Sequence, residues 1–291
     1  MMVGRDLGDI YKNLDRNKEI GEVLLEVKNV SSDYVKENSF VLRKGEVLGF
    51  SGLVGAGRTE LMRAIIGADP IRSGEIILER KKVQNRSPHE AMEHGIVLVP
   101  EDRKLQGILS NLDISDNINI SMLDKNSNSL GFVDAKKEEK IAEDGIKNFK
   151  IKTPSAKKKI VELSGGNQQK CIVARWISTN PKVLILDEPT AGLDPKERVK
   201  FRNIISSLGK EKTVLLSTHI VSDIEYIADQ ILIMKDGELI CSGTEQGITA
   251  SVKGYVWKCN VSTDVAQKLC NQYMVSNLRN GSEGNQAELR I

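Results

Sequence analysis

The residues best suited to chemistry form a glycine-rich run, Gly52–Thr59, with the sequence GLVGAGRT. Glycine lets the backbone curl tightly enough for several amides to face one phosphate group. The run follows an apolar strand pattern and precedes a segment with helical spacing, so the positive end of a helix would point at the same phosphate. Every fixed position of G-x-x-x-x-G-K-[ST] is present except the lysine, which is Arg58. The run predicts a phosphate-binding loop, with an ordinary strand-to-helix turn as the alternative.

Two positions of this run bear on catalysis. Thr59 is placed to offer its hydroxyl to magnesium. Arg58 carries a broad, planar guanidinium where lysine would present a compact charge to the terminal phosphates. Loop amides can still bind nucleotide, but transition-state stabilisation would weaken by ~2–4 kcal/mol, by analogy with losing one preorganised donor. The predicted nucleotide-binding residues here are Gly52, Gly55, Ala56, Gly57, Arg58, Thr59 and Glu60.

An acidic pair follows four apolar residues, Val183–Leu186. Parallel sheets bind ligands at the carboxyl ends of their strands, which is where Asp187 and Glu188 would lie. Asp187 suits a magnesium ion, and Glu188 is positioned to accept a proton from an attacking water. A solvated acidic turn is the alternative, but the phosphate-binding loop earlier in the chain favours the catalytic interpretation.

A second anion-binding helix start is predicted at Ser164, Gly165 and Gly166, within Leu163–Lys170 and ahead of a helix at Cys171–Thr179. A serine and two glycines at a helix start leave backbone amides open to an anion. An ordinary N-cap is the alternative. One chain would then carry two phosphate-binding sites on different parts of its fold.

Short apolar strand patterns alternate with helical spacing, which predicts an α/β fold with a parallel sheet covered on both faces. Between residues 105 and 176 the strand signal disappears, and a Lys/Glu/Ala-rich stretch, notably Asp134–Phe149, predicts an inserted helical subdomain. Strands are expected at Leu24–Val27, Ser39–Leu42, Val47–Phe50, Ile76–Leu78, Ile96–Val99, Val183–Leu186, Val214–Leu216 and Ile231–Met234.

The two ends of the chain differ from this core. Residues 1–22 are polar and charged and are expected to be a linker, and residues 23–250 would form the main domain. Residues 251–291 predict a small, β-rich C-terminal extension in which three strands surround one helix. These strands are expected at Tyr255–Val261, Tyr273–Leu278 and Ala287–Ile291.

Composition narrows the function classes. The 42 Lys and Arg residues nearly balance the 40 Asp and Glu, and aromatic residues make up only 4% of the chain, so no nucleic-acid partner is expected. The four cysteines form no C-x-x-C pair, which argues against a zinc site or a disulfide framework. No apolar run approaches the roughly 20 residues that span a bilayer. A role at a membrane would require docking onto another chain.

Taken in order, these motifs resemble the ATP-binding domains of ABC transporters over most of the chain. That family has a P-loop core with a helical subdomain, and two such domains sandwich ATP head to tail beside a membrane permease. Gly52–Thr59 resembles the Walker A loop, and Asp187 with Glu188 resembles the Walker B pair. Leu163–Gln168 resembles the signature motif, so its Ser-Gly-Gly would contact ATP held by the partner domain.

Three further positions take their expected roles from the same resemblance. Asp194 resembles the D-loop aspartate and is counted with the nucleotide-binding residues, and His219 resembles the catalytic switch histidine near the γ-phosphate. Glu101 stands where the family usually has a glutamine that senses magnesium and water, so it is expected beside Thr59 and Asp187 as a magnesium-binding residue. ATP and Mg²⁺ are the implied cofactors. The implied location is cytoplasmic, on the inner face of the cell membrane.

The resemblance points further, to the second half of the tandem ATPases that power ribose- and galactose-type sugar importers. Residues 1–190 carry it, through Arg58, Glu101, the string NQQK and an opening MVGR like the segment that joins the two halves. A first half would then precede this sequence. Residues 191–291 instead resemble a peptide or drug exporter ATPase. One hypothesis is a composite sequence joined near Asp187–Thr190, and the other is one divergent family member.

Sugar import is therefore the leading function and export the second. A catalytically weak, regulatory half that holds ATP is a third, motivated by Arg58 and Glu101. A soluble ABC ATPase of translation or DNA repair typically carries a second domain or a coiled-coil insertion, and neither is visible in the sequence. A GTPase or kinase would leave the signature string unexplained, and no Asn-Lys-x-Asp motif is present. The partner domain is expected to be a homologous half or a second copy.

Overall fold

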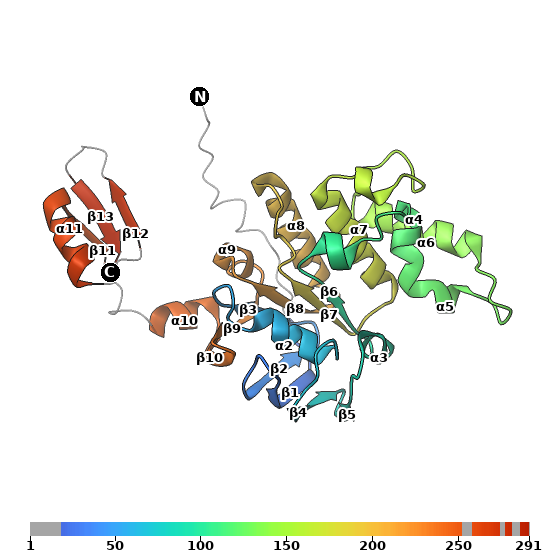
Figure 1. Cartoon of the computed structure of the whole chain (residues 1–291), viewed down its shortest axis with the longest axis horizontal. Coiled ribbons are helices and arrows are strands. Elements are labelled where there is room, and N and C mark those ends of the chain that lie inside the picture. Colours follow the sequence, from blue (N-terminus) through green and yellow to red (C-terminus); the bar gives the residue numbers. More distant parts are fainter. Residues whose placement is uncertain (1–18, 252–257, 274–276, 281–285, 291) are drawn as a thin grey trace. The chain divides into compact units, whose positions relative to one another are not determined.

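The computed structural model shows an α/β fold, which confirms the predicted class (Figure 1). The chain separates into two compact units, Met1–Ser242 and Gly243–Ile291. The described residues are 19–251, 258–273, 277–280 and 286–290. Most of the predicted linker lies outside them, and the first strand begins at Val23.

A six-stranded sheet forms the centre of the first unit, in the order β10-β9-β3-β8-β7-β6. The neighbours from β9 to β6 run parallel. Every residue of β7 and β8 is buried, which explains their apolar runs. Carboxyl ends meet at one edge, since Ser51 pairs with Thr218 and Asp187 with Ser217. The strands are β3 Val47–Ser51, β6 Ile96–Val99, β7 Val183–Asp187, β8 Thr213–Thr218, β9 Gln230–Lys235 and β10 Glu238–Gly243.

A second sheet is antiparallel and has the order β2-β1-β4-β5. Side chains of β2 alternate between buried and exposed, as expected for a sheet with one face packed and the other in water. Phe40 in β2 and Phe50 in β3 meet edge to face with ring centroids 5.0 Å apart, so the two sheets share one core. The strands are β1 Val23–Ser31, β2 Asn38–Arg43, β4 Ser73–Leu78 and β5 Lys81–Val83.

Helices occupy the stretch between β6 and β7 and gather at one end of the first unit, coloured green to yellow in Figure 1. Buried Arg175 braces this group, because its guanidinium donates to the Gly107 carbonyl at 2.7 Å and to Asn117 Oδ1 at 3.0 Å. The elements are the π-helix η1 Arg103–Gly107, α4 Ile114–Asn119, the 3-10 turn η2 Ile120–Met122, α5 Leu123–Asn126, α6 Ala135–Asn148, the 3-10 turn η3 Ile160–Glu162 and α7 Gly165–Ser178.

Some helices of the first unit start at a residue whose side chain caps them. Ser87 Oγ accepts from Glu90 N at 3.2 Å at the start of α3, and Gly95 ends that helix with φ +92°. Helix α7 begins at Gly165, six residues before the predicted start at Cys171, so the serine-glycine string lies in its first turn. The remaining helices are α2 Arg58–Ile65, α3 Pro88–His94, α8 Pro195–Leu208 and α9 Val221–Ile224.

The second unit pairs three antiparallel strands in the order β11-β13-β12. They overlap the strands expected from the sequence, whose residues 255–257, 274–276 and 291 lie outside the described part. The unit begins at Gly243, whereas the sequence placed the boundary after Ala250, inside α10. The elements are α10 Glu245–Ser251, β11 Lys258–Ser262, α11 Thr263–Gln272, β12 Asn277–Asn280 and β13 Gln286–Arg290.

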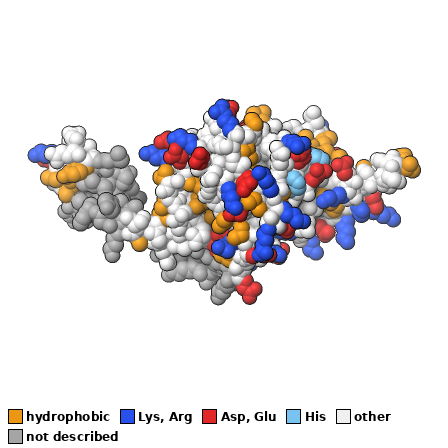
Figure 2. All heavy atoms as spheres, turned by 90° about the horizontal axis from the view of Figure 1, so that it is seen from below, with side chains coloured by type: hydrophobic (Ala, Val, Ile, Leu, Met, Phe, Trp, Pro, Cys, Tyr) orange, Lys and Arg blue, Asp and Glu red, His pale blue; other side chains and the backbone are white. Residues whose placement is uncertain are grey.

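The surface carries charges of both signs. Figure 2 shows basic and acidic side chains intermingled over one face of the first unit. None of the described helices combines the length and apolar character needed to cross a bilayer.

Packing under β3 gives a test of the fold. A Cβ on Gly49 would lie 2.5 Å from Ile224 Cγ2 and 2.9 Å from Ala228 Cβ. Overpacking of this kind costs about 1–3 kcal/mol, so Gly49→Ala should lower the unfolding temperature by several degrees. Gly243→Ala is the control, because a Cβ there meets its nearest neighbour at an ordinary 3.5 Å. Equal unfolding temperatures for the two variants would contradict this packing.

Candidate nucleotide-binding site

The glycine-rich run forms a tight loop between β3 and α2. Gly52 passes so close to β9 that a Cβ there would lie 2.6 Å from the Met234 carbonyl oxygen. Gly57 is the N-cap of α2 with φ +94°, a left-handed conformation that favours glycine. Leu53 and Val54 are 84% and 83% exposed at the outer part of the loop. The loop therefore opens to solvent over a helix start, where backbone amides can bind an anion.

Glu188 follows β7 and is buried at the carboxyl edge of the sheet. Its carboxylate accepts hydrogen bonds from Arg58 Nη1 at 2.7 Å, Thr218 Oγ1 at 2.9 Å and the backbone N of His219 at 2.8 Å. Nδ1 of His219 also lies 2.8 Å from this carboxylate. The φ of Glu188 is +43°, a costly value that persists where a side chain must be aimed. The structure thus brings together Arg58, Glu188 and His219.

These partners keep Glu188 ionised. Burial alone would raise the pKa of Glu188, but hydrogen bonds from His219, Arg58 and Thr218 outweigh it and lower the pKa. The side chains of Arg58 and Glu188 are only 7% and 3% exposed, so water screens this ion pair poorly. A carboxylate of lowered pKa is a weaker proton acceptor. The arrangement holds a negative charge in place, and Arg58 opposes its protonation.

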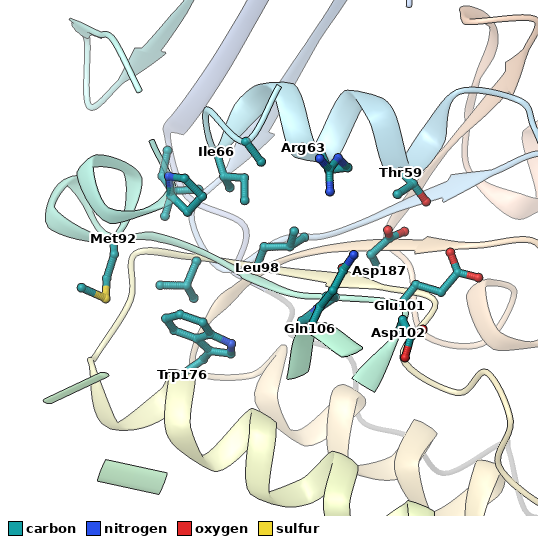
Figure 3. A pocket seen from close by; sticks show the side chains of 15 residues that line it. Thr59, Arg63, Ile66, Met92, Leu98, Glu101, Asp102, Gln106, Trp176 and Asp187 are labelled. Carbon is teal, nitrogen blue, oxygen red and sulfur yellow. The ribbon is translucent and has the colours of Figure 1, made fainter. Parts of the chain in front are cut away.

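Thr59, Asp187 and Glu101 line one hollow of about 310 Å³ (Figure 3). Asp187 accepts a hydrogen bond from Ser217 Oγ at 2.7 Å and is also hydrogen-bonded to Thr59. Burial raises the pKa of Asp187 to about 6, with Glu101 and Glu188 adding to the rise and the hydroxyl hydrogen bonds opposing it. A divalent cation beside Asp187 would favour the ionised form.

This donor set fits magnesium. A threonine hydroxyl and two carboxylates are hard oxygen ligands, and they lie beside the phosphate-binding loop. Within the described residues, no group of three or more His, Cys, Asp or Glu side chains could hold a metal unaided. Magnesium needs no such cage, because it keeps several waters and bonds to substrate phosphates.

The hollow also contains residues that the sequence did not single out. Gln106, on η1, points toward the polar end where Thr59, Asp187 and Glu101 lie (Figure 3). An amide is therefore available there although glutamine is missing at position 101. In the sequence, the one sign of this amide is that Gln106 follows Glu101 by five residues. The π-helical backbone of η1 brings Gln106 to the site. Trp176 lines the apolar end of the hollow.

The tip of α7, Ser164–Gly166, forms its hydrogen bonds independently of the glycine-rich loop. Ser164 is exposed at the N-cap, where its Oγ accepts from Asn167 Nδ2 at 3.1 Å. Gly166 is buried, and a Cβ there would lie 2.9 Å from Glu197 Oε2. No hydrogen bond or ion pair within residues 19–251 joins this tip to the glycine-rich loop. The exposed tip is open to a ligand held by another molecule.

Asp194 caps its own helix. Its Oδ1 accepts from the backbone N of Lys196 at 3.1 Å and of Glu197 at 3.0 Å, as an N-cap does. The loop before it is tied to the segment after β6 by Arg103, which donates to the Ala191 carbonyl at 2.9 Å. The nucleotide-binding role of Asp194 stays a prediction, and its local role is to begin α8.

A phosphate-binding loop between a buried strand and a helix, with two carboxylates at the carboxyl end of β7, two strands away in the same sheet, defines a P-loop nucleotide-binding domain. Residues 35–191 match the family model described as ABC transporter. The chain belongs to the ABC transporter family, as the motifs predicted. Its site contains the ATP-binding motifs of that family.

Curated relatives include importers of sugars. The chain is 42% identical over 261 residues to the ribose import ATP-binding protein RbsA 3 of Rubrobacter xylanophilus, covering 87% of this chain and 52% of that protein. It is 43% identical over 236 residues to the arabinose import ATP-binding protein AraG of Mannheimia succiniciproducens, covering 80% of this chain and 47% of that protein. The chain thus spans about half the length of these relatives. The match to the ribose import protein extends past residue 190.

Solved structures support the fold. The ATP-binding cassette MJ1267 of an ABC transporter superposes with a TM-score of 0.69 at 23% identity, over 80% of this chain and 96% of that one.

The composite origin of residues 1–190 and 191–291 stays a hypothesis.

Titration of Asp187 gives a test of the site without nucleotide or magnesium. Its pKa of about 6 exceeds that of an exposed aspartate, so the unfolded chain releases this proton first and stability falls as the pH rises from about 4 through about 6. Asp187→Asn should therefore stabilise the chain, by a margin that grows by about 1–2 kcal/mol between pH 5 and pH 8. Urea unfolding in EDTA measures it.

Asp124→Asn, at an exposed position on α5, is the control for the loss of one carboxylate charge. A gain for Asp187→Asn that is the same at both pH values would show that this carboxyl titrates normally.

Proposed function

We propose that this chain is the ATP-hydrolysing, nucleotide-binding domain of an ABC transporter of the sugar-importer type. The observation that carries the proposal is the meeting of the phosphate-binding loop with Asp187, Glu188 and His219 at one sheet edge. The sugar class is supported by relatives named as ribose, arabinose and galactose importers.

The groups at this edge fit ATP hydrolysis. Loop amides and the start of α2 would bind the terminal phosphates. Thr59, Asp187 and Glu101 would hold magnesium, which neutralises phosphate charge when bound. Glu188 would accept a proton from the attacking water, and His219 would orient Glu188 through the contacts already present.

Arg58 limits turnover in this scheme. Its guanidinium binds Glu188 at 2.7 Å, so a positive charge is directed at the proton acceptor. The same guanidinium is bulkier than the ammonium that the phosphate-binding loop usually offers. The chain would therefore bind ATP more readily than it hydrolyses ATP, and a catalytically weak regulatory half is the limiting case.

The exposed tip of α7 supports a second ATP-binding domain as a partner. ATP held by the loop of one domain would be covered by Ser164–Gly166 of the other, head to tail. A dimeric structure is known for the cassette MJ0796 bound to ADP and Pi. The partner of this chain would be a homologous half or a second copy.

The apolar end of the hollow supports a permease as a further partner. Ile66, Met92, Leu98 and Trp176 line it (Figure 3). The buried Nε1 of Trp176 has no hydrogen-bond partner among the described residues. An apolar hollow with an unmatched donor suits an amphipathic segment of another protein. We place the chain in the cytoplasm, docked on transmembrane subunits at the inner membrane face.

Export is the second candidate function, and His219 favours it. His219 lies within residues 191–291, which resemble a peptide or drug exporter ATPase, and its backbone and ring both contact Glu188. Stable self-association with ATP would favour the exporter class. A requirement for a separate homologous half would favour the importer class.

Glu188→Gln tests the proposed function. The wild-type chain should hydrolyse ATP only with magnesium, and the variant should be about 10²–10⁴-fold slower because it loses the proton acceptor. It should still bind ATP. Steady-state phosphate release measures turnover, and light scattering with ATP shows whether the variant forms dimers.

Glu211→Gln, at an exposed position, is the matched control and should keep wild-type turnover. Magnesium-independent turnover, or equal rates for Glu188→Gln and the wild type, would falsify the role of Glu188. A chain that binds no ATP would refute the function itself.

Arg58→Lys tests whether Arg58 is the residue that makes this chain a weak ATPase. Lysine restores a compact charge at the terminal phosphates, so kcat should rise by up to about 10²-fold, the effect of one preorganised donor. Arg58→Met should lose both ATP affinity and turnover. If lysine gives a kcat no higher than arginine does, Arg58 is not what limits hydrolysis.

A further inference from the structure

Arg103 lies where three candidate functional segments meet. It is the first residue of the π-helix η1 and follows the loop of Glu101, and its backbone N donates to the Glu101 carbonyl at 3.1 Å. Asp102 makes this turn rigid, because its carboxylate accepts from the backbone N of Lys104 at 2.9 Å and of Leu105 at 3.0 Å. A shift of Glu101 would therefore carry Arg103 with it.

The side chain of Arg103 reaches the loop before α8 and the tip of α7. Its Nη1 donates to the Ala191 carbonyl at 2.9 Å, and its Nη2 lies 3.5 Å from the Gly192 carbonyl, in the loop before α8. The same guanidinium lies against the tip of α7, since a Cβ on Gly165 would be 2.7 Å from Nη2. One side chain thus contacts the loop 191–194 and the signature tip.

Arg103 differs from an arginine that only holds the fold together. Arg175 is buried, and its Nε, Nη1 and Nη2 all donate hydrogen bonds. Arg103 is only partly buried, and its Nε has no hydrogen-bond partner among the described residues. Its contacts on the loop side are carbonyls of a partly exposed segment. The hydrogen bonds of Arg103 thus go to a partly exposed loop, whereas those of Arg175 go to buried groups of the helical part.

The far end of η1 is fixed. Arg175 donates to the Gly107 carbonyl at 2.7 Å, and a Cβ on Gly107 would lie 2.6 Å from Ile172 Cδ1 on α7. With that end held, movement of the loop after β6 is concentrated at the Arg103 end. π-Helical turns are frequent at functional sites.

We propose that Arg103 is a positioning residue that couples nucleotide binding beside Glu101 to the tip of α7 and the loop 191–194. The proposal rests on the proposed function, since it presumes that ATP binds at the glycine-rich loop. Nucleotide that shifts Glu101 would move the Arg103 guanidinium, and with it the loop 191–194 and the tip of α7 that is proposed to cover the partner's ATP. Coupling between two sites typically changes an equilibrium by about 5- to 150-fold.

Hydrogen exchange of the full chain tests the coupling. The Glu188→Gln background keeps ATP intact, and protein is used at concentrations where light scattering shows monomer. Magnesium and ATP should slow exchange in residues 52–60, and also in residues 165–168 and 191–194 by at least about fivefold. Adding Arg103→Met should leave protection of residues 52–60 unchanged and abolish the nucleotide-induced protection of the other two segments.

Two further variants separate coupling from packing. Arg103→Lys keeps one donor for the Ala191 carbonyl and should restore part of the coupled protection. Lys104→Met, at the exposed next position on η1, is the matched control and should behave as the parent does. If Arg103 only packs, its loss should speed exchange in residues 191–194 without nucleotide and leave the nucleotide-induced ratio unchanged.

The possible outcomes distinguish a failure of the coupling from a failure of the proposed function. No protection of residues 52–60 in the parent means that ATP does not bind there, and both ideas fail. Protection of residues 52–60 without any effect at 165–168 and 191–194 overturns the coupling alone. The coupling also fails, and the function stands, if Arg103→Met retains the full nucleotide-induced effect.

Discussion

The buried negative charge of Glu188 constrains the whole catalytic edge. Taking a carboxylate out of water is expensive unless strong donors surround it. Those donors come from separate parts of the chain: Arg58 starts α2, Thr218 ends β8, and His219 follows it. The strand order β3-β8-β7 sets them side by side. The glycine-rich loop, the acidic pair and His219 are therefore one electrostatic unit.

The sequence predicted those features that depend on local patterning. Strands buried on both faces must be apolar runs, so β7 and β8 were evident, and the glycine-rich turn has few alternatives. Contacts between distant segments were not predictable. Nothing in the sequence shows that Arg58 pairs with Glu188, because that pairing follows from strand order. Gln106 was missed because its place in the hollow depends on the backbone of the π-helix η1, which no pattern in the sequence announces.

Contacts across residue 190 bear on the two resemblances within the chain. Arg103 donates to Ala191, Thr190 donates to buried Asp223, and Glu188 accepts from His219. Each joins a residue of the importer-like part, or one at the junction, to a residue of the exporter-like part. Both parts therefore share one set of bonds around the site. A composite origin and a single divergent lineage must each satisfy these same contacts, so the fold is compatible with both.

The pairing of Arg58 with Glu188 also links proton transfer to nucleotide occupancy. Without nucleotide, the buried carboxylate is the anionic partner of this guanidinium. A triphosphate brings more charge and a bidentate geometry, so it competes for Arg58. With ATP bound as proposed, withdrawal of Arg58 would remove one of the interactions that lower the pKa of Glu188, and the carboxylate would become a better proton acceptor. An arginine at this position would therefore weaken Glu188 as a proton acceptor before ATP binds, and would also slow hydrolysis after ATP has bound.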